Sequence, residues 1–324
     1  MGLRQTVSQL ELTICEERDM QITVGITCFN NGDNIAETLN DVVNQQLHGC
    51  DKICEVLVVA SGCTDNTVRD VKEFEKKDER LHLIIEPDRL GKPSAINKMI
   101  QQMRGDALLL MSGDVRLPQR EFVEHMVQRL QGNTGVVSCR PKPVNSIHTI
   151  TGQMSNSMWG LHDKTLSVQN SNGLHGHAGE AFAIKREAVE TLPSRIVNDD
   201  AYMVLRAQQK GFDVSYDRES IVLNRPPESI AELMRQRARI INGHNQLRKI
   251  LGVSPDVLSF IIVRKPLLAF NIIEQEVREE QKAGRFKATS FLALITLELI
   301  SHIMAKLHRS NNRWTPSVSA KWRN

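Results

Sequence analysis

The sequence has few aromatic residues and little net charge, and this composition limits the classes of protein to which it can belong. Phenylalanine, tryptophan and tyrosine make up 4% of its 324 residues, and the formal charge is +3 at pH 7. Such a small charge gives no reason to expect a nucleic-acid partner, and the sequence carries no nucleic-acid-binding motif. With 40% hydrophobic and 24% charged residues, we expect a globular α/β protein rather than a disordered or fibrous one.

Closely spaced cysteines and a leader segment are also lacking. Of the six cysteines, only Cys50 and Cys54 lie near each other, and no second pair follows, so we expect reduced thiols rather than a zinc site. The segment 10–20 is too short and too charged for a signal peptide, which predicts a cytoplasmic, reducing setting. Residues 1–6 fit the loose myristoylation pattern, which many sequences match by chance.

Short apolar segments alternate with amphipathic ones over the first third of the chain. The expected strands are 22–29, 55–60, 81–86 and 107–111, and the expected helices are 34–46, 64–77 and 93–103. This alternation predicts an α/β fold with a doubly wound, mostly parallel sheet and helices on both faces. The unbroken apolar run 107–111 is typical of a central strand covered on both faces.

Further elements follow residue 118. We expect helices at 119–131 and 199–210, strands at 135–140, 181–184, 214–217 and 220–224, and a polar, loop-rich stretch at 141–180. Pro226 and Pro227 mark a boundary, and helices are predicted beyond it at 228–251 and within 256–307. The predicted divisions are an extension at 1–20, a catalytic domain at 21–225, and a helical region with a basic tail at 226–324.

The turn Ser112-Gly113-Asp114 directly follows the central strand. A carboxylate at this position can hold Mg²⁺ or Mn²⁺, cations that bridge phosphate oxygens, and Gly113 lets the backbone approach a ligand closely. Lys92 is placed to meet phosphate as a point charge. The alternative is a plain turn that caps the next element.

Three other groups of polar residues carry both a chemical and a structural interpretation. Asp199-Asp200 opens a helix and could supply a general base or cap the helix. The arginines of 236–239 could offset a diphosphate or form a solvated basic face. The sequence His175-Gly176-His177, with Glu180, favours hydrogen bonding in a polar loop over metal binding.

In order and at their spacing, these segments resemble the family 2 glycosyltransferases of the GT-A fold over residues ~20–245. TCFNNGDNIAETLNDVVNQQ is similar to their first strand and helix, VVASGCTDNT to their VVDDGSTDNT turn, and LGKPSAINKMI to their RGKxxALNxGI segment. SGDVRLP resembles their DxD-type metal motif, NDDAYMVLRAQQKGF their acidic pair, and RQRARI their QxxRW motif.

The resemblance implies roles for individual residues. Asp200 takes the position of the catalytic base, beside Asp199, and Asp114 that of the ligand to Mg²⁺ or Mn²⁺. Phe29 would stack on the base of the sugar nucleotide. The residues implied for binding the nucleotide sugar are Cys28, Phe29, Asn30, Ser61, Lys92, Gly113 and Arg239, and those implied for the acceptor side are Gly179, Glu180 and Gln236.

The chain departs from the family pattern at three points. Ala60-Ser61 replaces two acids of the turn, so base recognition is expected to rest on Ser61 and backbone groups. Ser112 replaces the first acid of DxD, and Ile240 replaces the tryptophan of QxxRW, which argues against processive polymer synthesis. The resemblance implies inverting transfer from a nucleoside-diphosphate sugar to a hydroxyl of a glycan, polysaccharide or lipid-linked acceptor. A non-catalytic sugar-nucleotide-binding relative and a nucleotidyltransferase stay open as alternatives.

The C-terminal region contains a 20-residue apolar segment, 288–307, long enough to cross a bilayer. Glu298 and His302 on one of its faces make the transfer free energy into a bilayer close to zero. Packing on the catalytic domain, self-association into a homo-oligomer, and lying in the membrane interface therefore remain open. The following tail carries basic residues and two tryptophans without an acid, and the apolar stretch 257–270 could serve the same surface, which predicts peripheral contact at the cytoplasmic face.

Overall fold

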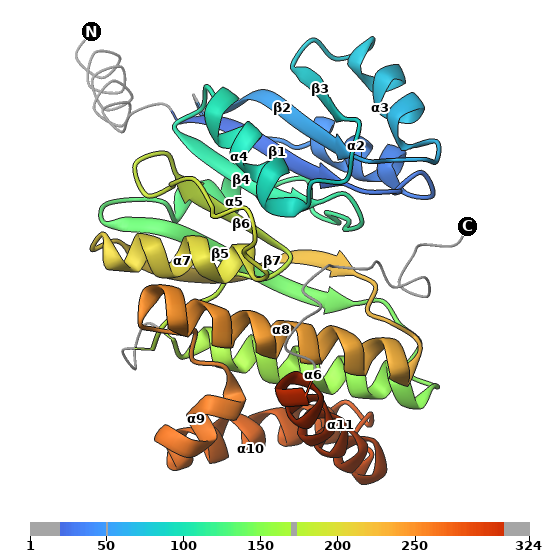
Figure 1. Ribbon diagram of the computed structural model, residues 1–324, viewed down its shortest axis with the longest axis vertical. Helices are drawn as coiled ribbons and strands as arrows, with labels where there is room; N and C mark the ends of the chain where they lie inside the picture. The colour runs from blue at the N-terminus through green and yellow to red at the C-terminus, as the bar shows by residue number, and fades with distance from the viewer. Residues whose placement is uncertain (1–19, 50, 170–173, 308–324) are drawn as a thin grey trace, which may run out of the picture.

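The computed structural model describes residues 20–49, 51–169 and 174–307 (Figure 1). The myristoylation pattern, the cysteine at position 50 and the basic tail beyond 307 lie outside these residues. Four cysteines in the described ranges are free thiols: Cys28, Cys54, Cys63 and Cys139.

A single seven-stranded sheet forms the centre of the molecule. Its strands are β1 (Gln21–Cys28), β2 (Lys52–Ser61), β3 (Leu81–Glu86), β4 (Ala107–Ser112), β5 (Thr134–Pro143), β6 (Ala181–Lys185) and β7 (Asp213–Asn224). Their order across the sheet is β3-β2-β1-β4-β6-β5-β7. All neighbouring pairs are parallel except those that involve β6, so the predicted mostly parallel, doubly wound sheet is confirmed.

Helices cover both faces of the sheet, as predicted. The helices against one face are α2 (Ile35–Val43), α3 (Thr67–Glu75) and α5 (Phe122–Gln128); those against the other are α4 (Lys92–Gln102) and α7 (Asp199–Gln209). Strand β2 supplies both layers: Val56 and Val58 belong to one core cluster, and Leu57 and Val59 to the other. Both faces of β2 are therefore buried, which explains why apolar and polar residues do not alternate along it.

The loop predicted at 141–180 is wrong at residues 150–167, which form α6 (Ile150–Ser167). The side chain of Thr149 caps its start by accepting a hydrogen bond from the N–H of Gly152. The helix buries Met154 together with residues of the C-terminal helices. Many polar side chains interrupt its apolar pattern, so partners distant in sequence, rather than local periodicity, stabilise it.

The two strands predicted at 214–217 and 220–224 form one strand, β7. The register with β5 shifts where Cys139 pairs with Asp217 and Arg140 pairs with Ile221. A bulge therefore accommodates the polar residues that suggested a break.

The predicted C-terminal helices are present as α8 (Ile230–Leu251), α9 (Leu258–Arg264), α10 (Pro266–Lys282) and α11 (Ala288–Leu307). Helix α8 packs against α11, and α6 packs against both α10 and α11. In Figure 1, α6 and α8 lie below the sheet, and α9, α10 and α11 form the lower end of the molecule. Within this assembly, α6 also contacts β5 and β7 of the sheet.

Candidate active site

The turn after β4 is held close against the end of β1. The N–H of Gly113 donates to the carbonyl of Thr27 at 2.9 Å, and Asn34 Nδ2 donates to the carbonyl of Gly113 at 2.8 Å. A Cβ at Gly113 would lie 2.7 Å from Cys28 Sγ. Glycine is therefore required for this close approach, which places the neighbouring Asp114 at the carboxyl-terminal edge of the parallel strands.

The acidic pair opens α7, as predicted, and each carboxylate has a different partner. Asp199 Oδ2 lies 3.1 Å from Lys92 Nζ, so α7 and the start of α4 meet through an ion pair. Asp200 Oδ2 accepts a hydrogen bond from the N–H of Gly179 at 3.0 Å. Burial and the neighbouring Asp199 raise the pKa of Asp200, while Lys92 opposes this shift.

The electrostatic interactions show that these residues gather around one point. Burial alone would lower the pKa of Lys92, yet Asp199, Asp200 and Glu180 together raise it. The same three carboxylates face Arg239, whose pKa is nevertheless lowered by its burial. Side chains from α4, α7, α8 and the start of β6 therefore interact across one small volume.

Burial also raises the pKa values of two further carboxyl groups in this volume, those of Asp114 and Glu180. Burial raises the pKa of Asp114, and Lys92 partly offsets the effect. Burial and the nearby Asp114 raise the pKa of Glu180 to about 7, against the effect of Lys92. Asn224 Nδ2 donates to Glu180 Oε1 at 3.4 Å, so the end of β7 also reaches this volume.

The residues predicted to meet the nucleoside lie at the ends of β1 and β2. The guanidinium carbon of Arg89 lies 3.9 Å from the ring centroid of Phe29, in the geometry of a cation–π contact. Asn30 adopts a left-handed backbone, with φ 53°, and its Oδ1 accepts from the N–H of Thr64. Ser61 is buried and accepts from the N–H of Leu90 at 3.3 Å.

Two other residues in the predicted motifs, Arg237 and His177, belong to separate hydrogen-bond networks. Arg237 binds Glu298 of α11 through two hydrogen bonds, at 2.9 and 2.8 Å, while Gln236 is half-buried on α8. His177 forms hydrogen bonds with Gln169 and His162, at 3.0 and 3.2 Å. Hydrogen bonding, rather than metal binding, was the expected role for this histidine.

Sequence reasoning missed Arg89 and Asn224. Neither has a marker in the sequence, because the contact of each depends on a strand or loop far away in the chain. Within 20–49, 51–169 and 174–307, no three histidine, cysteine or carboxylate side chains form a ready-made metal cage.

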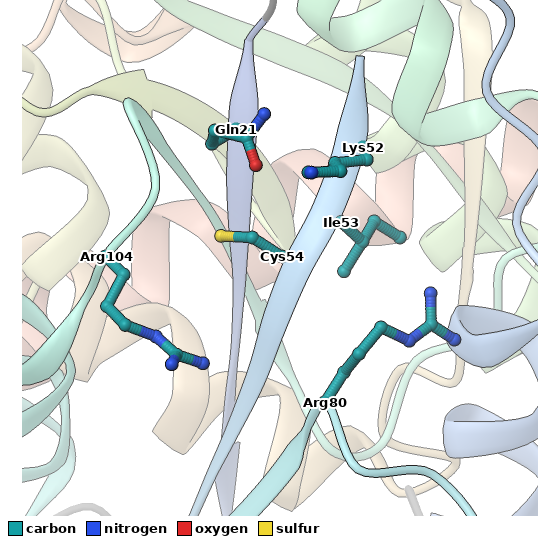
Figure 2. A pocket seen from close by; sticks show the side chains of 6 residues that line it. All are labelled: Gln21, Lys52, Ile53, Cys54, Arg80 and Arg104. Atoms are coloured by element: carbon teal, nitrogen blue, oxygen red, sulfur yellow. The ribbon is translucent and has the colours of Figure 1, made fainter. Parts of the chain in front are cut away.

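A surface pocket lies at the opposite ends of the strands. Gln21 starts β1 and Lys52 starts β2, and Figure 2 shows both with Cys54, Arg80 and Arg104 around the hollow. None of the predicted site residues lines this pocket. Ligands of open α/β sheets bind at the carboxyl ends of strands, so the gathered carboxylates, and not this hollow, mark the candidate site.

A family comparison agrees with this geometry. The profile of Glycosyl transferase family 2 matches residues 23–192, which include most of β1, the Gly113 turn and Lys92. The chain belongs to glycosyl transferase family 2. It is therefore a glycosyltransferase, as its sequence motifs predicted.

Curated relatives and solved structures extend the comparison. Poly-beta-1,6-N-acetyl-D-glucosamine synthases of Staphylococcus aureus strain MSSA476 and Staphylococcus epidermidis are each 20% identical to the chain, over 235 and 231 residues. These alignments cover 70% and 68% of this chain. The chain spans about half the length of these relatives, 55% and 54%.

Two solved glycosyltransferases share the GT-A fold. A mannosyltransferase from Pyrobaculum calidifontis, in complex with GDP-Man and Mn²⁺, has a TM-score of 0.60 at 19% identity, covering 90% of this chain and 88% of its own. Glucosyl-3-phosphoglycerate synthase from Mycobacterium tuberculosis, in complex with Mn²⁺, UDP and glucosyl-3-phosphoglycerate, has a TM-score of 0.52 at 17% identity, covering 77% and 85%. The first match extends over most of the chain.

Proposed function

We propose that this glycosyltransferase moves a sugar, with inversion, from a nucleoside-diphosphate sugar to a hydroxyl of a glycan, polysaccharide or lipid-linked acceptor. The observation that supports it most is the meeting of Lys92, Asp199 and Asp200 beside Asp114 at the carboxyl edge of the sheet. The names of the relatives and the ligands of the two solved structures are consistent with this class of reaction.

Asp200 is the general base of the proposed reaction. The N–H of Gly179 orients its carboxylate, and burial raises its pKa, which makes it a better proton acceptor than an ordinary aspartate. It takes the proton from the acceptor hydroxyl as the sugar transfers. Asp199 keeps Lys92 in place, and the ammonium then offsets the charge that develops on the leaving diphosphate.

The remaining assignments follow the layout of the site. Phe29 and Ser61, with Cys28 and Asn30, lie at the end that we assign to the nucleoside. Arg239 faces the carboxylates and is assigned, together with Gly113, to binding the diphosphate. We assign Gly179 and Gln236 to the acceptor side; Glu180, which the resemblance also implied there, interacts with Asp114 instead.

The residues around Asp114 fit a divalent cation such as Mg²⁺ or Mn²⁺. These cations prefer oxygen ligands, and when they act with phosphates they need only one or two carboxylates from the protein. Asp114 supplies a carboxylate, and the Asn224 Oδ1 atom is buried without a hydrogen-bond partner within the described residues. When bound, such a cation supplies positive charge to the diphosphate.

We also propose that the protein works in the cytoplasm, at an anionic membrane surface. Helix α11 is long and apolar enough to cross a bilayer, and only 28% of its most apolar window is buried. Its polar face contacts the protein, because Glu298 binds Arg237 and Ser301 donates to the carbonyl of Met234. The apolar face is left outside, with Leu299 62% exposed, which favours lying in the interface over spanning.

The end formed by α9, α10 and α11 carries exposed basic residues, which an anionic membrane surface attracts. Val263 and Leu267 are each 81% exposed, and the exposed Arg264 and Lys265 lie between them. Beyond Leu307 the sequence contains four arginine or lysine residues, two tryptophans and no acid: Arg309, Arg313, Trp314, Lys321, Trp322 and Arg323. Basic residues beside apolar ones favour anionic lipids.

The proposed reaction is tested by incubating the protein with UDP- and GDP-sugars, a glycan or lipid-linked acceptor that carries a free hydroxyl, and Mg²⁺ or Mn²⁺. We expect release of the nucleoside diphosphate with at least one of these sugars, and a transferred sugar of inverted anomeric configuration by NMR. A nucleotidyltransferase would instead release pyrophosphate from a nucleoside triphosphate and a sugar 1-phosphate. A non-catalytic relative would bind a sugar nucleotide without turnover.

A further inference from the structure

Ser112 occupies the position of the first acid in the metal motif, and Glu180 directly precedes β6, the strand that pairs with β4 beside it. Strands β4 and β6 are antiparallel, and Met111 pairs with Ala181. Continuing this register by one residue sets Ser112 opposite Glu180. Directly opposed residues of an antiparallel pair project from the same face, with Cβ atoms about 4.5–5.5 Å apart. Glu180 directly precedes β6, so this register brings its carboxylate to the side of the sheet on which an acid at position 112 would project.

The surroundings of Glu180 are those of a cation ligand. It interacts electrostatically with Asp114, and Asn224 Nδ2 holds one of its oxygens at 3.4 Å. Asn224 is 5% exposed, and its Oδ1 is buried without a hydrogen-bond partner among the described residues. The two carboxylates, and the buried amide oxygen of the asparagine that holds one of them, are oxygen ligands of the kind that a hard divalent cation prefers.

We propose that Glu180 supplies, from β6, the second carboxylate to the divalent cation that Ser112 on β4 cannot supply. The inference rests on the proposed function, because it assumes a cation on the diphosphate at Asp114. A cation shared with a diphosphate needs no more than two protein carboxylates, which agrees with the lack of a three-ligand cage in the described ranges.

The test is the effect of Mn²⁺ on UDP and GDP affinity, measured by calorimetry, with Mn²⁺ binding followed separately by electron paramagnetic resonance. Glu180→Gln keeps an oxygen that can accept from Asn224, so the fold is retained. We expect the Mn²⁺-dependent part of the affinity to fall about tenfold or more. The double variant Ser112→Asp/Glu180→Gln places a carboxylate on β4 in exchange for the one removed at position 180. It should recover most of the lost Mn²⁺-dependent affinity.

Three other outcomes separate the alternatives. Unchanged Mn²⁺-dependent affinity in Glu180→Gln overturns the inference, and a raised KM for the acceptor alone would then give Glu180 the acceptor-side role. A loss that Ser112→Asp does not recover also overturns it, because the two positions would not be equivalent. If Asp114→Asn gains as much affinity from Mn²⁺ as the unmodified protein, the metal arrangement of the proposed function is itself wrong.

Discussion

At the scale of single residues, a glycine controls how closely the two loops beside Phe29 approach each other. Gly62 has a φ of 63°, and a Cβ there would lie 2.7 Å from the backbone nitrogen of Arg89. The Arg89 side chain in turn lies over Phe29. The sequence predicted Phe29 at this place but not Arg89, because the contact depends on a left-handed glycine that brings distant segments together.

We predict that Gly62→Ala lowers both stability and nucleotide affinity. A left-handed alanine costs about 1–2 kcal/mol, and the clash with backbone additionally moves Arg89 from Phe29. Gly132→Ala is the matched control, since Gly132 has a φ of 53° and nothing within 4 Å of its added Cβ. Urea unfolding and calorimetry with UDP and GDP provide the measurements; equal effects of the two variants would contradict the assigned contact.

At the scale of elements, the limits of sequence reasoning are clearest in α6. The strand expected at 107–111 was found as Ala107–Ser112, because an apolar run buried on both faces carries its own signal. Helix α6 has no comparable signal, since a buried charge attaches it to the sheet. Asp163 is 2% exposed and accepts hydrogen bonds from Tyr216 and Arg218 of β7.

We predict that Asp163→Asn lowers the free energy of unfolding by about 3 kcal/mol at pH 7, as expected when one partner of a buried ionic network is removed. Burial would raise the pKa of Asp163, but Arg218, Tyr216 and Arg140 lower it overall. A carboxyl whose pKa is lower in the folded state stabilises above its unfolded pKa of about 3.9 and loses this effect as the pH falls.

The difference between Asp163→Asn and the unmodified protein should therefore shrink from pH 7 to pH 3 in urea unfolding curves. Glu279→Gln is the control. Its side chain is 45% exposed and pairs with Lys164 and Arg218, and such half-exposed pairs contribute roughly 1 kcal/mol or less. A difference for Asp163→Asn that stays constant down to pH 3 would show that its charge is not responsible.

At the scale of the whole molecule, the candidate active site and the proposed membrane-contact surface are formed by different parts of the protein. The candidate site lies at the carboxyl edge of the sheet, whereas the exposed apolar residues assigned to the membrane lie on α9–α11, at the lower end in Figure 1. The sequence left three arrangements open for 288–307. The structure shows that one face of α11 packs against α8, but the occupant of its exposed face stays a prediction.

We predict that the protein floats with vesicles containing phosphatidylglycerol, and less so with neutral vesicles or at high salt. Replacing Leu267 and Leu299 together with glutamate should remove this binding. Glutamate at Ile85, which is 46% exposed on β3, should not. Absence of flotation together with a dimer in light scattering, lost in the Leu267/Leu299 double variant, would identify a second copy of the chain as the occupant.

The central claim is that Asp200 takes the proton of the acceptor while other groups hold the sugar nucleotide. The most direct test of this claim measures two quantities for the Asp200→Asn variant and the unmodified protein: the turnover number and the affinity for the sugar nucleotide. An asparagine can still accept from the N–H of Gly179, and Asp213→Asn, at an exposed acid on β7, is the control. We predict that turnover falls about 10²–10⁴-fold while sugar-nucleotide affinity stays within a few-fold. Near-normal turnover in Asp200→Asn would contradict the account.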